Sequence, residues 1–191
     1  MKNKLILITI ILMISTALFA QEKTSAVKNE FMWKVGGAHA ADMGKFGLDM
    51  SFNYMYNFDP LFAFGFEGDF FWLTWTDKIK DEVTNINHDS KKNLYVVPLF
   101  LNGQIRIPFV RDIIGIEPAA TFGFGFACMF GSNGSHGAFP ALQGLGSLYF
   151  NPFQGSNIDF VIDFGYRYLP MNSGKKDMSG FVARFGIKAM L

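Results

Sequence analysis

The chain has 191 residues, half of them hydrophobic, and 23 are phenylalanine. Its formal net charge is +1, from 17 basic and 16 acidic residues, so no basic excess points to a nucleic-acid or anionic-lipid partner. The composition is too apolar for a disordered chain, and a single cysteine, Cys128, excludes an intrachain disulfide.

The first 20 residues have the pattern of a secretory signal peptide. Lys2 and Lys4 precede an apolar run that begins at Leu5, and small residues lead to Ala20. We therefore expect residues 1–20 to be a signal peptide, residues 21–29 a short polar tail, and residues 30–191 the folded domain. The alternative is an uncleaved anchor helix, for which the apolar run is short.

The run from Lys45 to Phe58, KFGLDMSFNYMYNF, carries most of the structural information. Its even positions are all large and apolar or aromatic, and its odd positions are mostly polar or small. A period of two predicts a β-strand with one apolar and one polar face. At about 3.4 Å per residue the run extends for roughly 45 Å. A transmembrane β-strand needs only about 9–11 residues and alternates in this way.

Similar alternation recurs along the rest of the chain. It predicts eight strands at residues 30–41, 44–58, 61–76, 93–107, 114–130, 139–150, 157–169 and 179–191. Lipid tolerates only helices and closed barrels. We therefore predict an all-β fold, an eight-stranded antiparallel up-and-down transmembrane β-barrel.

The seven connections differ in kind. Residues 59–60, 108–113 and 151–156 read as tight turns, whereas 77–92, 131–138 and 170–178 read as polar loops; residues 41–44 are a short connection where a long one is due. Short turns on one side and long loops on the other are typical of outer-membrane barrels. Pro98 and Pro118 fall inside predicted strands, and Pro98 suggests a bulge.

The polar faces of these strands carry balanced charges. A lipid-facing Arg or Lys near the bilayer midplane costs about 2–4 kcal/mol, so in a membrane the charges must face inward. A soluble lipocalin-like barrel would instead place the Phe face inside, but eight strands enclose too little space for so many rings. The predicted lumen charge network is Lys34, Lys45, Asp49, Glu67, Asp69, Arg106, Glu117, Asp159, Asp163, Arg167, Arg184 and Lys188.

Tyrosine and tryptophan gather toward the strand ends, as expected for the two aromatic girdles of a membrane barrel. The predicted periplasmic girdle contains Trp33, Tyr54, Tyr56 and Tyr149, and the predicted outer girdle contains Trp72, Trp75, Tyr95, Tyr166 and Tyr168.

The end of the chain has a further signature. Phe181, Phe185, Ile187 and Leu191 share one phase of the last strand. This resembles the carboxy-terminal targeting strand of outer-membrane barrels, which implies the barrel-assembly machinery as a partner during biogenesis. The length of the mature chain resembles that of the small eight-stranded outer-membrane barrels of the OmpX and OmpA-membrane-domain type. The segment from Tyr95 to Phe109, YVVPLFLNGQIRIPF, resembles the central hairpin strand of the outer membrane protein beta-barrel domain family. The resemblance implies a monomer in the lipid of a bacterial outer membrane.

Three functions remain open. The first is a structural or adhesion-type role, with the charge-rich loop 77–92 as the surface for a host molecule or neighbouring protein. The second is a narrow ion path through the charged lumen, for which a salt-bridged plug is the alternative. The third is a lipid-modifying enzyme that uses Ser135 and His136, although no acidic residue lies nearby in the sequence.

We predict no enzyme activity, no cofactor and no metal. His39, His88 and His136 could bind zinc, but they lack cysteine partners and the spacing of a helical pair.

Overall fold

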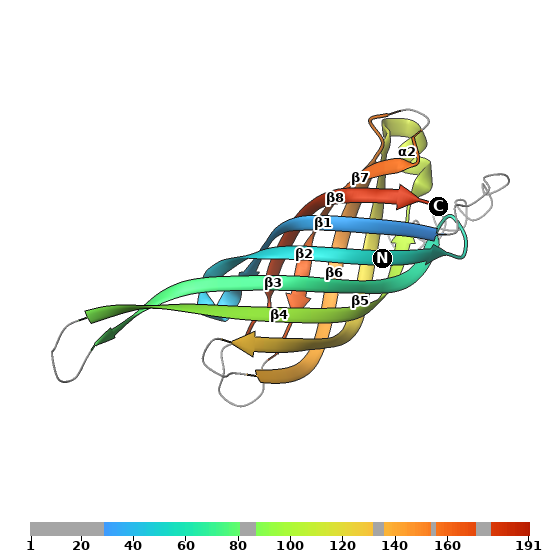
Figure 1. Cartoon of the computed structure of the whole chain (residues 1–191). Coiled ribbons are helices and arrows are strands. Elements are labelled where there is room, and N and C mark those ends of the chain that lie inside the picture. Colours follow the sequence, from blue (N-terminus) through green and yellow to red (C-terminus); the bar gives the residue numbers. More distant parts are fainter. Residues whose placement is uncertain (1–28, 81–86, 132–135, 154–155, 171–176) are drawn as a thin grey trace, which may run out of the picture.

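The computed structural model describes residues 29–80, 87–131, 136–153, 156–170 and 177–191. Eight strands form a closed barrel in sequence order, and β8 pairs with β1 to complete it (Figure 1). The strands are β1 (Asn29–Ala40), β2 (Lys45–Asn57), β3 (Phe62–Lys80), β4 (Asn87–Arg106), β5 (Ile116–Gly131), β6 (His136–Phe150), β7 (Ile158–Tyr168) and β8 (Gly180–Met190). All neighbours are antiparallel, which confirms the predicted fold class. The predicted signal peptide and most of the polar tail lie outside the described residues.

The two ends of the barrel differ. β1 begins and β8 ends at the same end, which we call the terminal end. At the opposite end, β3 and β4 extend well beyond the other strands (Figure 1); we call it the hairpin end. The three predicted turns therefore lie at the terminal end and the predicted loops at the hairpin end. The predicted difference in length is wrong, because nine residues separate β4 from β5 at the terminal end and only four separate β5 from β6 at the hairpin end.

The predicted loop 77–92 is wrong over most of its length. The β3–β4 ladder continues from Thr74 opposite Asn93 to Lys80 opposite Asn87. Among the described residues, segments 74–80 and 87–93 pair only with each other, and we call them the protruding hairpin. The polar composition suggests a loop. Antiparallel strands pair through backbone hydrogen bonds, however, and this pairing continues past the barrel although the side chains are polar.

One predicted turn is a helix. Pro108–Ile114 form α2, between β4 and β5 at the terminal end. Pro108 lies in its first turn, where the fixed φ of proline favours a helix and its missing N–H is not needed. Gly115, at φ 75°, ends the helix and donates its N–H to the Arg111 carbonyl at 2.8 Å. At the hairpin end, residues 41–44 are short as expected: a 3₁₀ turn (η1, Ala41–Met43) followed by Gly44 at φ 58°.

The two strand prolines are accommodated without a bulge. Around Pro98 the β3–β4 pairing passes from Gly68 opposite Leu99 to Phe71 opposite Val96, so the ladder is interrupted but no residue is inserted. The predicted bulge is therefore wrong: proline only removes a donor from the β3 side. Pro118 lies beyond the β4–β5 ladder, and its carbonyl accepts the Ile107 N–H at 3.0 Å.

Inward-facing glycines allow neighbouring strands to approach closely. A Cβ at Gly65 would lie 1.8 Å from the Tyr54 carbonyl oxygen, and one at Gly165 would lie 2.1 Å from the Gly144 oxygen. Only glycine fits at these two positions, which suits the strong curvature of a small barrel.

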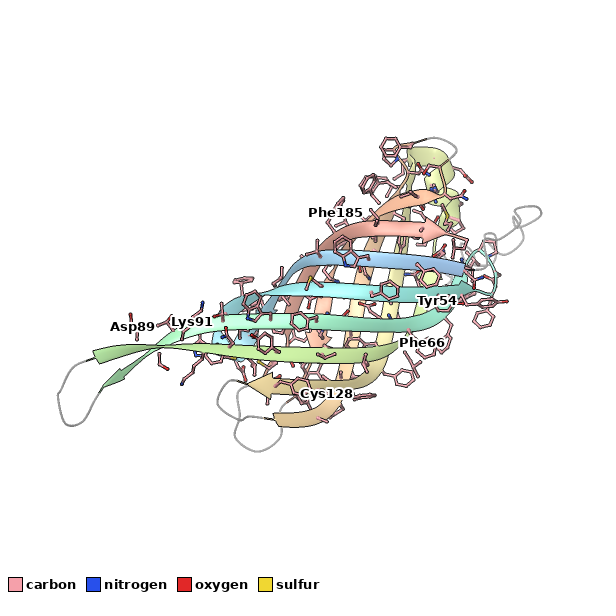
Figure 2. All side chains as sticks on the ribbon, viewed as in Figure 1. Tyr54, Phe66, Asp89, Lys91, Cys128 and Phe185 are labelled. Atoms are coloured by element: carbon pink, nitrogen blue, oxygen red, sulfur yellow. The ribbon has the colours of Figure 1, made fainter. Side chains whose placement is uncertain are left out.

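The two faces of the sheet are sharply different. The outer face carries exposed aromatic and aliphatic side chains along every strand; Phe66 and Phe185, for example, project away from the barrel (Figure 2). The inner face holds nearly all the buried charges. Among the described residues, no helix is both long enough and apolar enough to span a bilayer.

Candidate functional site

The described part of the lumen contains two ion-pair clusters and a large apolar cluster, stacked along the barrel. A smaller apolar cluster accompanies them and consists of Met32, Met55, Ala63, Ala119, Tyr149 and Val161. We call the first ion-pair cluster the terminal cluster, because it lies nearest the terminal end. Arg106 on β4 forms a bidentate pair with Glu30 on β1, and Lys188 on β8 lies 3.0 Å from Asp159 on β7. The Lys188 ammonium also lies 4.3 Å from the centre of the Tyr149 ring, within the range of a cation–π interaction.

Helix α2 closes the terminal cluster from outside the strands. Its Arg111 donates to Asp159 at 2.7 and 3.1 Å and to Glu117 at 3.3 Å. The hydrogen bond to Asp159 raises the pKa of the Arg111 guanidinium. Through these hydrogen bonds Arg111 ties the β4–β5 connection to β7, across the mouth of the barrel.

The second group, the central cluster, lies in the middle of the barrel. Arg184 on β8 contacts four carboxylates: Glu67 at 2.7 Å, Asp69 at 3.1 Å, and Asp49 and Asp163 each at 3.4 Å. The other members are Arg167, which pairs with Asp49 and Asp69, and Lys34, which lies 2.6 Å from Asp163. All seven side chains are almost completely buried.

Amide side chains add hydrogen bonds to one carboxylate oxygen of the central cluster, Glu67 Oε2. Asn53 and Asn102 both donate to Glu67, at 2.9 and 2.7 Å, and Gln143 donates to Asn102 at 3.1 Å. On the side of the central cluster toward the terminal end, Gln104 donates to Thr121 and Tyr149. Such hydrogen bonds offset part of the cost of burying the charges. Some atoms of the cluster, among them Arg167 Nε and Arg184 Nε, have no hydrogen-bond partner in the described structure.

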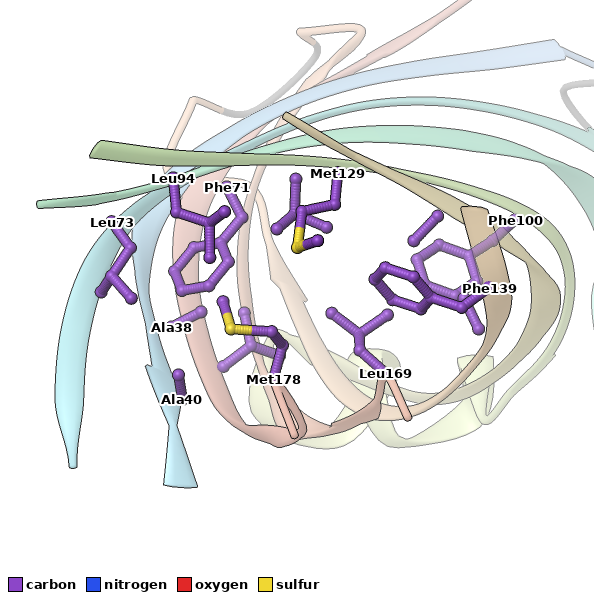
Figure 3. Close-up of a cluster of buried hydrophobic side chains, with 14 of the residues drawn as sticks. Ala38, Ala40, Phe71, Leu73, Leu94, Phe100, Met129, Phe139, Leu169 and Met178 are labelled. Atoms are coloured by element: carbon purple, nitrogen blue, oxygen red, sulfur yellow. The ribbon is translucent and has the colours of Figure 1, made fainter. Parts of the chain in front are cut away.

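The third group, which we call the apolar plug, fills the lumen toward the hairpin end (Figure 3). On β3 its Phe71 and Leu73 follow directly after the charged Glu67 and Asp69. Phe100 touches the central cluster, because the Arg167 guanidinium lies 5.8 Å from the centre of its ring. The plug consists of Ala38, Ala40, Phe71, Leu73, Leu94, Val96, Phe100, Ala127, Met129, Phe139, Ala141, Leu145, Leu169, Met178 and Val182.

The predicted charge network lies largely where the sequence places it. Eleven of its twelve residues are buried in the lumen: Lys34, Asp49, Glu67, Asp69, Arg106, Glu117, Asp159, Asp163, Arg167, Arg184 and Lys188. Lys45 is different: it is the first residue of β2, it is exposed at the hairpin end, and it lies outside both clusters. The alternation points it inward, but the lumen has already opened to water at that position.

The sequence analysis missed two charged members of the lumen. Glu30 shares its inward phase with Lys34, and only its position at the strand start concealed it. Arg111 lies in a predicted turn, outside any alternating pattern, so no sequence signal assigns it to the lumen.

The aromatic residues divide between the faces. Seven of the nine predicted girdle residues lie on the outer face: Trp33, Tyr54, Tyr56, Trp72, Tyr95, Tyr166 and Tyr168. Two assignments are wrong. Tyr149 is only 1% exposed and lies in the lumen between Arg106 and Lys188, and Trp75 packs against the apolar plug. Both follow the inward phase of their strands, so the alternation outweighs the preference of these residue types for interfaces.

The last strand closes the barrel. Phe181, Phe185 and Ile187 of β8 are exposed on the outer face, and Leu191, also exposed, donates its N–H to the Asn29 carbonyl at 2.9 Å. The final residues are therefore held by β1, and their apolar side chains remain on the outside.

Of the residues considered for zinc or ester chemistry, only His39 has a side chain within the described part of the chain. Among the described residues, no three His, Cys, Asp or Glu side chains gather in a way that could hold a metal ion. His39 instead packs against Phe46, with ring centres 4.5 Å apart. Ser135 and the side chains of His88 and His136 lie outside the described part of the chain.

A closed eight-stranded barrel with an apolar outer face and an ion-paired interior defines the class of protein. It is a transmembrane β-barrel of the outer-membrane type, because only such a closure satisfies every backbone group in lipid.

Comparisons agree with this class. Neisserial surface protein A (NspA) is similar over 88% of this chain and 100% of its own, with 12% identity and a TM-score of 0.58, which shows a shared fold. Ail, the attachment invasion locus protein of Yersinia pestis, matches over 86% of this chain and 97% of its own, with 16% identity and a TM-score of 0.42, too low to carry an argument. No model of a known protein family matches the sequence, and no curated protein matches it.

Proposed function

We propose that this outer-membrane barrel acts in surface interaction, and that the protruding hairpin is the part that contacts the partner. The observation that carries the proposal is the β3–β4 ladder, which runs to Lys80 and Asn87, far beyond the neighbouring strands. A lipid-embedded scaffold that presents one long polar ribbon is suited to adhesion, since binding residues are commonly placed on loops held by a rigid scaffold.

The chemistry of the hairpin suggests a polar partner. Residues 77–92 contain four lysines and four acidic residues. Asp89 and Lys91 lie on the part of the hairpin that extends away from the barrel (Figure 2). Such mixed charge favours a polar protein or glycan surface at the face of a host cell or of a neighbouring bacterium, and contacts of this kind depend on ionic strength.

The contents of the lumen support a closed scaffold over an ion path. Phe71, Phe100 and Phe139 fill the lumen at the hairpin end, and the central cluster fills its middle. An ion crossing the barrel would have to displace both the rings and a set of buried, mutually paired charges. We therefore place the narrow-pore alternative second. We also propose a non-enzymatic role, because no acidic residue lies near Ser135 and His136 in the sequence.

The proposal is tested by shortening the hairpin. Residues 77–90 are replaced with Asn-Gly, a pair that favours a tight two-residue turn and that leaves Thr76 opposite Lys91 as in the native ladder. The variant is expressed on bacteria beside the wild type. We expect adhesion to cultured epithelial cells, or between the bacteria themselves, to be lost, while the gel-mobility shift on boiling still reports a folded barrel. A second variant, Asp89→Asn with Lys91→Gln, keeps the ribbon and tests its charge.

Equal adhesion by the wild type and the shortened chain, with both folded, would refute the role of the hairpin. Loss of the mobility shift in the wild type itself would refute the membrane barrel.

A further inference from the structure

A furrow runs along the outer face of β4. Its floor is formed by Leu99 and Leu101, and its walls are the larger side chains of the neighbouring strands, Phe66 on β3 and Phe124 on β5. The hollow has a volume of about 580 Å³ and is lined by three consecutive residues from each strand: 66–68, 99–101 and 124–126. It lies within the exposed apolar belt, because Phe66 and Phe124 are each 59% exposed.

Two glycines keep the furrow open. Gly68 stands opposite Leu99, and a Cβ there would only touch the Leu99 side chain, at 3.4 Å. Gly103, the next outward position of β4 after Leu101, stands between Phe64 and Phe122, and nothing lies within 4 Å of the position its Cβ would take. Just beyond the hollow, toward the terminal end, the outer face of β4 therefore has no side chain at Gly103, and we include this position in the furrow. From residue 99 to 103 the furrow is about 14 Å long, at about 3.4 Å per residue.

The geometry points to a binding site for a single acyl chain of a phospholipid. This inference rests on the proposed membrane location, since the furrow is continuous with the face that meets lipid. At the strand tilt of about 40° that is typical of such barrels, the furrow covers about 10 Å of depth, so it holds part of one acyl chain within a hydrocarbon core of about 30 Å. A linear chain between two rows of rings gains dispersion contacts along its whole length, which an empty hollow would forfeit.

Apolar side chains continue from the furrow toward the terminal end. Beyond Gly103 come Ile105 at the end of β4 and Ile107 just after it, both exposed, and then α2 with exposed Phe109. A phospholipid chain that reaches the barrel from this side can follow these side chains to the furrow.

Native mass spectrometry of the full barrel, released from nanodiscs of a single phosphatidylethanolamine species, tests the site. Wild-type protein is expected to retain one phospholipid, seen as a mass increase of one lipid. Gly103→Leu and Gly68→Leu place a side chain in the furrow and are expected to lose that increase. Gly37→Leu is the matched control, because Gly37 also faces outward with space around it but stands between Leu48 and Ala183, without aromatic walls.

The outcomes separate clearly. No retained lipid on the wild type, equal retention on the Gly103→Leu variant, or equal loss on the Gly37→Leu variant would overturn the furrow as a specific site. A mass of two copies in place of the lipid would also overturn it, in favour of contact between barrels. If the gel-mobility shift on boiling is absent from the wild type, the proposed membrane barrel has failed, independently of the furrow.

Discussion

Arg184 on β8 and Glu67 on β3 form a buried ion pair across the lumen, with nitrogen and oxygen 2.7 Å apart, although β1 and β2 separate their strands in the barrel wall. The pair links opposite parts of the wall through the interior. It also forms the middle of the central cluster, because both residues contact further charged partners.

Removing the Arg184 charge should strongly destabilise the barrel. Arg184→Met would leave four buried carboxylates with two cations, and breaking a buried ion pair from one side costs about 3–5 kcal/mol. Urea unfolding of the refolded variant in phospholipid vesicles would measure this as a loss of unfolding free energy. Lys45→Met, at an exposed site outside the clusters, should change it by less than about 0.5 kcal/mol. A small effect at Arg184 would argue against a tightly paired lumen.

A charge on the outer face should cost more in the middle of a strand than at its end. Phe122 lies in the middle of β5, whereas Phe46 is the second residue of β2, at the hairpin end. Phe122→Arg is therefore expected to lose about 2–4 kcal/mol and Phe46→Arg about 0–1 kcal/mol. The same vesicle-based unfolding assay compares them. Equal costs at the two depths would contradict the assignment of this face to lipid.

The lumen should not conduct ions. The apolar plug and the central cluster fill successive levels of the lumen along the barrel. Purified protein in a planar bilayer is therefore expected to give no unitary current steps in concentrated KCl. Regular steps that scale with salt concentration would instead favour the narrow pore. An OmpA-type barrel of known conductance, added to the same bilayer, verifies that insertion would have been detected.

The close approach at Gly65 should make its substitution costly. A methyl group there would meet the Tyr54 backbone oxygen, which cannot move aside, so Gly65→Ala is expected to cost about 1–3 kcal/mol of unfolding free energy, as overpacking does. Gly103→Ala, where nothing is close, should be nearly neutral. If both variants unfold alike, the strands do not approach as closely at Gly65 as described.

The strands and their faces could be read from the sequence because both depend on one local rule. The alternation of side chains is fixed by strand geometry, and lipid outside with a packed lumen inside makes that alternation strict. It therefore placed Asp49, Arg184 and their partners on the inner face. At Tyr149 and Trp75 the preference of Tyr and Trp for membrane interfaces disagreed with the inward position given by the alternation, and the alternation predicted the correct face.

The features that the sequence did not predict lie mainly where the barrel wall ends and the chain meets water. The alternation does not tell where the wall of the barrel ends, so Lys45 was assigned to the lumen and the protruding hairpin was assigned to a loop. Arg111 reaches Asp159 through the tertiary arrangement of α2, which no local pattern encodes. The apolar plug was also missed, because the narrow interior was expected to exclude rings such as Phe71 and Phe100. These few rings occupy one level of the lumen, between the central cluster and the hairpin end.

The opposite orientation of Phe124 and Phe100 on neighbouring strands offers the most direct test of the central claim, that the Phe-rich face meets lipid. In a background with Trp33, Trp72 and Trp75 replaced by phenylalanine, a single tryptophan is placed at either position by Phe124→Trp or Phe100→Trp. Fluorescence is then measured in vesicles that contain phospholipid with a spin label in the middle of its acyl chain. The account predicts strong quenching at position 124 and little at position 100, and stronger quenching at position 100 than at 124 would contradict it.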